Sequence, residues 1–281
     1  MEQLSGIQIF AGYNIKYPEY EVITPQRKQS FTVRTLTTSE EEQLKGSILT
    51  PNTIAEHLAQ VLWGCIIKKP DYIKTYDDFI RMVTLRDRDC LVYGLFVATY
   101  KDTQAFSFKC PECGFENKVK INMEKGFTYQ LWDKDVDCLE NKIEIPLTIL
   151  QGVKCILKVP VIADEIELAK KSLETSAEDS QLMTDLLMVK CFELPPSKEK
   201  KVNEEGKEVE VTKQNFIDDR DKILEAYKVL PSYDRKLITK QYLDQIDKYR
   251  IGVSAENTCR CGYKQEVRID VTRQFFQSLL G

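Results

Sequence analysis

Two short cysteine pairs, far apart in the chain, constrain the fold more than any other feature. The first is Cys110-Pro-Glu-Cys113 and the second is Cys259-Arg-Cys261, and residues 114–258 lie between them. A structural zinc ion takes four ligands in a tetrahedron, whereas one short turn offers only two thiolates. We therefore expect one zinc ion to join the two distant segments, with the ligands Cys110, Cys113, Cys259 and Cys261.

Each pair has the form of a zinc knuckle, a tight turn that presents two thiolates to a metal. Gly114 and Gly262 directly follow the second cysteine, where glycine tolerates a positive φ and lets backbone N–H groups turn toward the sulfurs. The second knuckle departs from the usual spacing, since only Arg260 separates its cysteines. Four cysteines would leave no position for water, which favours a structural over a catalytic ion. A redox pair at a helix N-terminus and a cluster without metal are the alternatives.

The sequences that follow the two knuckles are related. Cys113-Gly-Phe-Glu-Asn-Lys-Val-Lys-Ile-Asn-Met123 aligns with Cys261-Gly-Tyr-Lys-Gln-Glu-Val-Arg-Ile-Asp-Val271 at the aromatic residue, the valine, the basic residue and the isoleucine. Upstream, Thr75-Tyr-Asp77 and Ser232-Tyr-Asp234 are each expected to open a helix. The chain therefore contains two related units, each predicted as a helix followed by a metal knuckle and a strand.

The hydrophobic pattern predicts an α+β protein: a split zinc ribbon formed by two distant cysteine knuckles, with a mainly helical insertion and an N-terminal β region. Short strands are expected at residues 7–10, 20–23 and 31–34, where β-branched and aromatic residues alternate with polar ones. Helices are expected to start at Thr38, at Thr50-Pro51 and at Thr75. Asp164 is expected to cap a long helix that runs to about Phe192, where Pro195-Pro196 would end it.

These patterns divide the chain into five predicted regions. They are an N-terminal β-rich segment (1–45), a helical region (46–109), the first knuckle hairpin (110–125), an α/β insertion (126–258), and the second knuckle with a C-terminal helix (259–281). Residues 197–214 form a strongly charged segment within the insertion, predicted as a solvated loop or a hairpin that turns near Gly206, with a functional arm as the alternative.

Composition and motifs point away from several classes of protein. The net charge of −4 gives no global attraction to nucleic acid or to an anionic membrane. No stretch approaches the roughly 18 to 20 apolar residues of a membrane span, and the N-terminus lacks a signal pattern, so we expect a cytosol-like compartment and no disulfide framework. His57 is the only histidine, and no phosphate-binding glycine loop occurs, so nothing supports an enzyme.

Two segments suggest binding surfaces. The C-terminal residues Phe275, Phe276, Leu279 and Leu280 form one apolar stripe of a short helix, which either docks on its own domain or anchors a partner. Basic residues follow each knuckle, as in ribbons that bind nucleic acid, but acidic residues interrupt them. These basic residues are Lys118, Lys120, Lys264 and Arg268. A zinc ribbon that binds nucleic acid or acts in transcription is therefore the alternative function.

The order of motifs resembles a known family. Leu36-Thr-Thr-Ser-Glu, Tyr76-Asp-Asp-Phe-Ile, both knuckles with their following strands, and the Phe275-Phe276 ending together are similar to the baseplate hub and baseplate assembly proteins of T4-like contractile-tailed bacteriophages. The resemblance implies a structural or assembly role in the tail baseplate, through contacts with other baseplate proteins and without catalysis. It also implies a place in the virion tail, or in the host cytoplasm during assembly.

Overall fold

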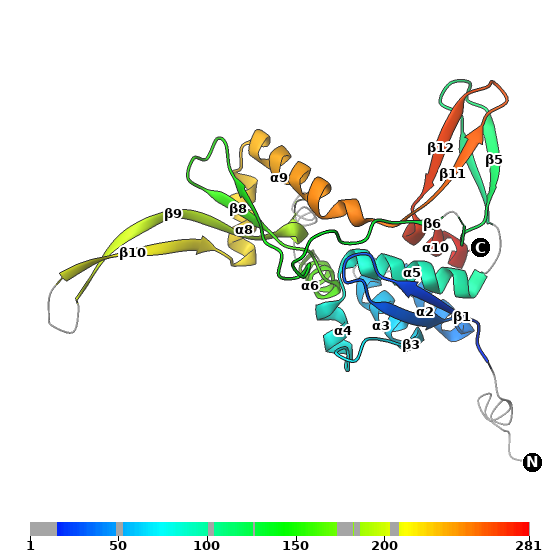
Figure 1. The fold of residues 1–281 in the computed structure, drawn as a ribbon, viewed down its shortest axis with the longest axis horizontal. Helices are drawn as coiled ribbons and strands as arrows, with labels where there is room; N and C mark the ends of the chain where they lie inside the picture. The colour runs from blue at the N-terminus through cyan, green and yellow to red at the C-terminus, as the bar shows by residue number, and fades with distance from the viewer. Residues whose placement is uncertain are drawn as a thin grey trace, which may run out of the picture.

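The computed structural model describes residues 16–48, 53–100, 104–125, 127–172, 182, 186–202 and 208–280. Its helices and strands pack around two hydrophobic cores, and two hairpins project from the body of the first (Figure 1). Elements from both ends of the chain contribute to the first core, whereas the second core is formed by residues 132–249. Apart from residues 162–172, which pack on the first core, the middle of the chain therefore forms a separate core between two segments that both return to the first.

The first core is built around α5 (Leu85–Tyr100), a helix buried on nearly every side. An antiparallel sheet of β1 (Glu19–Ile23), β2 (Ser30–Arg34) and β3 (Ile66–Lys68) packs against it. The approach is closest at Gly94, where a Cβ would lie 2.8 Å from Val22 Cγ1, so a side chain there would collide with β1. The other helices at this core are α2 (Thr38–Ile48), α3 (Ile54–Cys65), α4 (Tyr76–Met82), α6 (Ile162–Ser172) and α10 (Val271–Leu280).

Local capping signals explain where the early helices begin. Thr37 and Glu40 bond reciprocally at the start of α2, with Glu40 accepting the Thr37 N–H at 2.8 Å. Thr75 and Asp78 form a complete capping box at the start of α4. These caps confirm the helix starts expected at Thr38 and Thr75. The structure also confirms the strands expected at 20–23 and 31–34. The strand expected at residues 7–10 and the start at Thr50-Pro51 lie outside the described residues.

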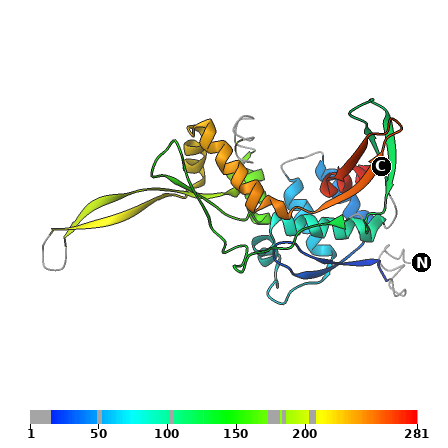
Figure 2. The ribbon, with the colours of Figure 1, turned by 45° about the horizontal axis from the view of Figure 1, so that its top comes forward.

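The second core lies beneath a four-stranded antiparallel sheet in the order β10-β9-β8-β7. Its strands are β7 (Ile143–Pro146), β8 (Lys154–Leu157), β9 (Val189–Val202) and β10 (Glu208–Ile217). The helices α8 (Arg220–Lys228) and α9 (Ser232–Gln245) and the 3-10 turns η1 (Leu186–Met188) and η2 (Asp247–Tyr249) pack on it. The part of β9 that follows its pairing with β8 is paired with β10 in the described residues. This two-stranded hairpin projects away from the body (Figures 1 and 2).

Two hairpins carry the cysteine knuckles. β4 (Gln104–Lys109) pairs with β5 (Glu116–Ile121), and β11 (Gly252–Thr258) pairs with β12 (Lys264–Ile269), both antiparallel. A short strand, β6 (Phe127–Thr128), joins the edge of β11. The hairpins stand side by side in both views and leave the body in the same direction, so their turns meet at one end (Figures 1 and 2).

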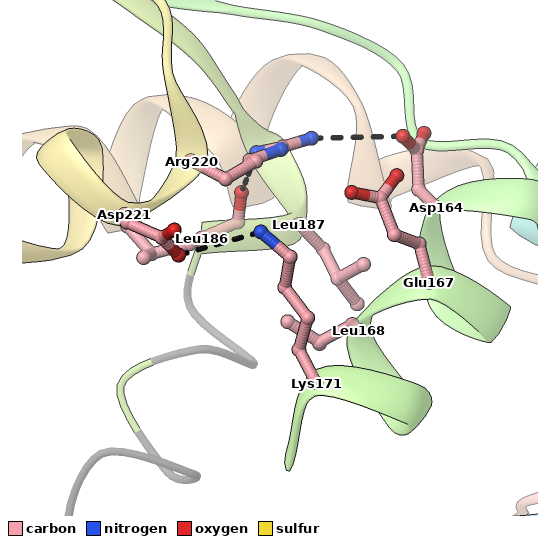
Figure 3. Close-up of a pocket in the computed structure, with 8 residues that line it drawn as sticks. All are labelled: Asp164, Glu167, Leu168, Lys171, Leu186, Leu187, Arg220 and Asp221. Carbon is pink, nitrogen blue, oxygen red and sulfur yellow. Dashed lines mark hydrogen bonds and ion pairs between the residues drawn. The ribbon is translucent and has the colours of Figure 1, made fainter. Parts of the chain in front are cut away.

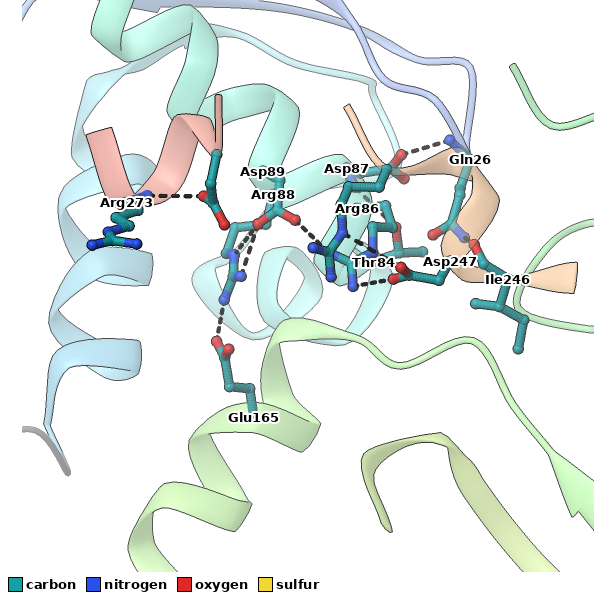
Figure 4. Close-up of polar contacts among 12 residues, drawn as sticks. Gln26, Thr84, Arg86, Asp87, Arg88, Asp89, Glu165, Ile246, Asp247 and Arg273 are labelled. Carbon is teal, nitrogen blue, oxygen red and sulfur yellow. Dashed lines mark hydrogen bonds and ion pairs between the residues drawn. The ribbon is translucent and has the colours of Figure 1, made fainter. Parts of the chain in front are cut away.

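A cluster of charged side chains connects the two cores at the start of α5 (Figure 4). Arg86 forms ion pairs with Asp89 and with Asp247 of η2, and Arg88 forms one with Glu165 of α6. Burying such charges is costly unless each has a partner, and here each arginine has at least two carboxylates. The Arg86–Asp247 pair therefore joins the two cores, whereas Arg88 joins α5 to residue 165 within the first.

One part of the predicted fold is wrong. The insertion is not mainly helical, because it contains the four-stranded sheet as well as α6, α8 and α9. The helix expected from Asp164 to about Phe192 begins at Ile162 and ends at Ser172, and Pro195-Pro196 lies inside β9. Val189, Cys191 and Phe192 are buried by sheet pairing with β8, so tertiary contacts override the helical pattern. The charged segment is a hairpin, as one of the expected alternatives had it.

Candidate metal centre

The two knuckles have the same backbone construction at the tips of their hairpins. The Cys110 N–H donates to Phe115 O at 2.9 Å, and the Cys259 N–H donates to Tyr263 O at 2.8 Å. Gly114 and Gly262 adopt φ values of 67° and 87°, which are favourable for glycine and strained for residues with a Cβ. The internal repeat is therefore present in the backbone as well as in the sequence. The second knuckle is one residue shorter, but its turn still presents two cysteines.

The four predicted ligands come together in one cluster. All four sulfurs lie within 4.8 Å of one another, with Cys110 Sγ 3.8 Å from Cys261 Sγ and Cys113 Sγ 3.6 Å from Cys259 Sγ. A tetrahedral zinc site with Zn–S bonds near 2.3 Å separates its sulfurs by about 3.8 Å. A disulfide would need about 2.05 Å. The donor set and its spacing thus fit a four-thiolate metal ion such as zinc.

Each hairpin supplies one buried and one exposed ligand. Cys110 and Cys259 are each 2% exposed, whereas Cys113 and Cys261 lie at the surface. The side chain between the cysteines of the second knuckle also reaches the first, because the Arg260 guanidinium lies 3.7 Å from the centroid of the Phe115 ring. The two knuckles therefore contact each other through side chains in addition to the shared sulfur cluster.

The environment of the cluster shifts thiol ionisation in opposite directions. The Cys261 N–H hydrogen-bonds the Cys259 sulfur and, with the Asn117 side chain, lowers the pKa of Cys259 to about 6. At Cys261 the Tyr263 N–H acts in the same sense, but desolvation and the hydrogen bonds shared with the other thiols raise the pKa to about 12. Neighbouring thiols cannot all ionise without a cation, so a divalent metal would displace the remaining protons.

Other residues singled out in the sequence lie elsewhere. Phe275 and Leu279 are 0% and 3% exposed and belong to the first core, and Phe276 is half-buried against it. α10 packs on α5 and α2, while the side chain of Leu280 lies outside the described part. Contact of these residues with a partner stays a prediction. Lys118 and Lys120 are exposed on β5, and His57 is half-buried in α3.

The sequence did not indicate the contacts of three further residues. Asn117 is 6% exposed beside the cluster, and Gln265 occupies the same position of the repeat in the second unit. Asp234 is fully buried and accepts backbone N–H groups from the loop between β7 and β8. The repeat and the Ser232-Tyr-Asp234 motif were the available signals for these residues. They did not show what the side chains would contact.

The small hollow between α6 and α8 is not a substrate site (Figure 3). Its volume is about 30 Å³, enough for one or two water molecules. Ion pairs cross it, from Arg220 to Asp164 at 3.6 Å and from Lys171 to Asp221 at 3.3 Å. This hollow is a packing seam. A larger cleft of about 880 Å³ is lined by the ion-paired Arg86, Arg88 and Asp247 and by β11 and β12.

Fold and site together define a class: an α+β protein with two cores, in which four cysteines from distant segments form a cluster that could bind a metal. The model of the family described as T4 bacteriophage base plate protein matches residues 17–277. The chain belongs to this family, and the expected resemblance to baseplate proteins is confirmed. No characterised protein and no solved structure matches the chain. Among the described residues, no helix is long and apolar enough to span a bilayer.

Proposed function

We propose that this protein is a structural or assembly component of the baseplate of a contractile phage tail, and that it acts through contacts with other baseplate proteins. The observation that carries the proposal is the family match, which extends over residues 17–277 and so includes both cores and both knuckles. The shape is consistent with this role, because the β9–β10 hairpin and the knuckle hairpins project from the body and offer extended surfaces (Figure 1). The proposal includes no catalytic step.

We further propose that Cys110, Cys113, Cys259 and Cys261 bind a structural zinc ion. The support is the sulfur geometry, since the separations of 3.6 and 3.8 Å are those of a tetrahedral site. When bound, the ion would supply a crosslink between hairpins that lie on either side of the second core in the sequence. The chain's own residues prepare this site: glycines allow the tight turns, and backbone N–H groups face the sulfurs.

Phage genetics combined with particle analysis tests the baseplate role. Infection by a phage that lacks this gene should produce tails with incomplete baseplates, and a plasmid copy should restore them. Mass spectrometry of purified tails would show whether the protein remains in the particle or acts only during assembly. Normal, infectious particles from the deletion phage would contradict the proposal.

The nucleic-acid alternative has less support. Lys118 and Lys120 are exposed, but Arg268 of the second hairpin is paired with Glu266 at 3.1 Å, which reduces the positive field there. Phosphate contacts make nucleic-acid affinity fall steeply with salt. Binding to DNA or RNA that weakens about tenfold or more between 50 and 200 mM salt would favour the alternative.

A further inference from the structure

The helix α9 presents an exposed stripe on the side opposite its buried face. Asp234 and Ile238 point into the second core, and both are 0% exposed. The opposite side carries residues at the spacing i, i+3, i+7 and i+10, which places them in one row. In order they are Tyr233, Lys236, Lys240 and Leu243. The helix lies on the outside of the molecule in both views (Figures 1 and 2), and all four residues of the row are exposed.

The ends of this row are apolar. Tyr233 is 61% exposed and Leu243 is 49% exposed, and they lie about 15 Å apart along the helix axis. Next to Tyr233, the loop between β7 and β8 exposes Ile149 (57%) and Leu150 (38%). Single exposed apolar residues are normal on protein surfaces, whereas grouped ones mark interaction sites; here two lie on α9 and two on the adjoining loop.

A buried carboxylate holds the loop against the helix. Asp234 accepts the backbone N–H groups of Thr148 at 2.8 Å, Ile149 at 3.1 Å and Leu150 at 3.3 Å. These bonds satisfy three consecutive donors and fix the loop beside the first turn of α9. Because these bonds already hold the loop backbone, a partner that covers Ile149 and Leu150 does not have to order it.

The middle of the row is positively charged. Lys236 and Lys240 are exposed, and neither has an ion pair within the described part of the chain. Two other lysines do have acidic partners, Lys154 with Glu144 at 3.0 Å and Lys248 with Asp133 at 2.7 Å. Two unpaired cations between apolar ends are complementary to a surface that offers carboxylates between apolar contacts.

We propose that Ile149, Leu150, Tyr233, Lys236, Lys240 and Leu243, called here the α9 surface, bind an acidic protein surface. Carboxylates of the partner meet the two lysines, and apolar side chains cover Tyr233 at one end and Leu243 at the other. A protein fits better than nucleic acid, because a phosphate backbone would leave the four apolar side chains without partners. That this partner is another baseplate component rests on the proposed function, whereas its chemistry follows from the α9 surface.

A photocrosslinking residue in place of Tyr233, introduced into the full chain in infected cells, tests the proposal. The expected product is a crosslink to a different protein, at a segment that carries at least two Asp or Glu residues. Reversal of both charges, in Lys236→Glu with Lys240→Glu, should reduce the crosslink about tenfold or more. Changing the mapped carboxylates of the partner to lysine should restore it in the reversed variant.

Matched variants separate this surface from a general effect of charge or stability. Lys68→Glu with Lys74→Glu makes the same charge change at exposed positions on the first body and should leave the crosslink intact. If the reversed variant unfolds early, Lys236→Gln with Lys240→Gln provides the decisive comparison. A crosslink to nucleic acid, to a second copy of the chain, or one insensitive to both lysines overturns the proposal. If deletion of the gene left the tails unchanged, that result would instead count against the baseplate role.

Discussion

The guanidinium of Arg260 lies 3.7 Å from the centroid of the Phe115 ring, so the residue between the cysteines of one knuckle covers the aromatic residue of the other. The second knuckle is one residue shorter than usual, and its single intervening side chain is the one that makes this contact. The repeat places Tyr263 where the first unit has Phe115, but an arginine lies between the cysteines only in the second unit. The shortened knuckle is therefore joined to its partner by a cation–π contact as well as by its sulfurs.

Removal of this contact should weaken metal binding without abolishing it. A cation–π pair at a partly exposed site contributes about 0.5 to 1 kcal/mol, so Arg260→Ala should lower zinc affinity about two- to fivefold. Lys at this position should retain part of the effect. Competition with a chromophoric chelator at fixed pH measures the difference, and equal affinities for the wild type and Arg260→Ala would show that the contact does not support the site.

Loss of one ligand from each hairpin should remove the metal. The double variant Cys110→Ser with Cys259→Ser leaves only Cys113 and Cys261, both exposed, and should lose stoichiometric zinc. Because binding to the folded state stabilises it, chelation should lower the melting temperature of the wild type but not of the variant. Metal analysis by mass spectrometry checks the first expectation and calorimetry the second. Cys191→Ala, outside the cluster, serves as the control and should keep its zinc; retention of zinc by the double variant would refute the site.

Asp234 should be essential for the second core and the adjoining loop. Asp234→Ala leaves three backbone N–H groups, those of residues 148–150, without their acceptor. With about 1 kcal/mol for each such bond, the free energy of unfolding should fall by roughly 2 to 4 kcal/mol. Asp234→Asn keeps one acceptor oxygen and should lose less. Urea unfolding gives the magnitude, and limited proteolysis should show faster cleavage in residues 148–150; unchanged proteolysis would argue against a clamp.

Asp87 should make stability depend on pH. Burial at the start of α5 raises the pKa of its carboxyl to about 7, although the N–H groups of Gln26 and Arg27 favour the charged form. In the unfolded chain the pKa is near 3.8. Between about pH 4 and pH 7 the folded state therefore holds a proton that the unfolded state releases, and stability falls as pH rises through this window.

Asp87→Asn, which resembles the protonated carboxyl, isolates this effect from other titrating groups. The difference in unfolding free energy between wild type and variant should change by up to about 4 kcal/mol across the window, to the disadvantage of the wild type at higher pH. Thermal unfolding at a series of pH values measures it. Parallel curves for the two proteins would mean that Asp87 titrates normally.

Some elements of the fold were predictable because short-range chemistry decides them. The capping box of Thr75 and Asp78 and the glycine turns at Gly114 and Gly262 follow from a few neighbouring residues. The helix expected through Phe192 failed for the opposite reason. Whether Val189–Phe192 forms a strand depends on pairing with β8, which is distant in sequence.

The sequence by itself identified the four cysteines of the candidate metal centre, their two related turns and the membership of a baseplate family. The cysteine spacing and the repeat are local patterns, so they can be recognised without the fold. Only the tertiary structure decided that the four sulfurs meet within 4.8 Å. It also decided that Arg260 reaches Phe115, that Asp234 holds a loop more than 80 residues away, and that Arg86 connects the two cores. These contacts join residues that are far apart in the chain. Separation in sequence does not predict distance in space, so the contacts form only when the whole chain folds.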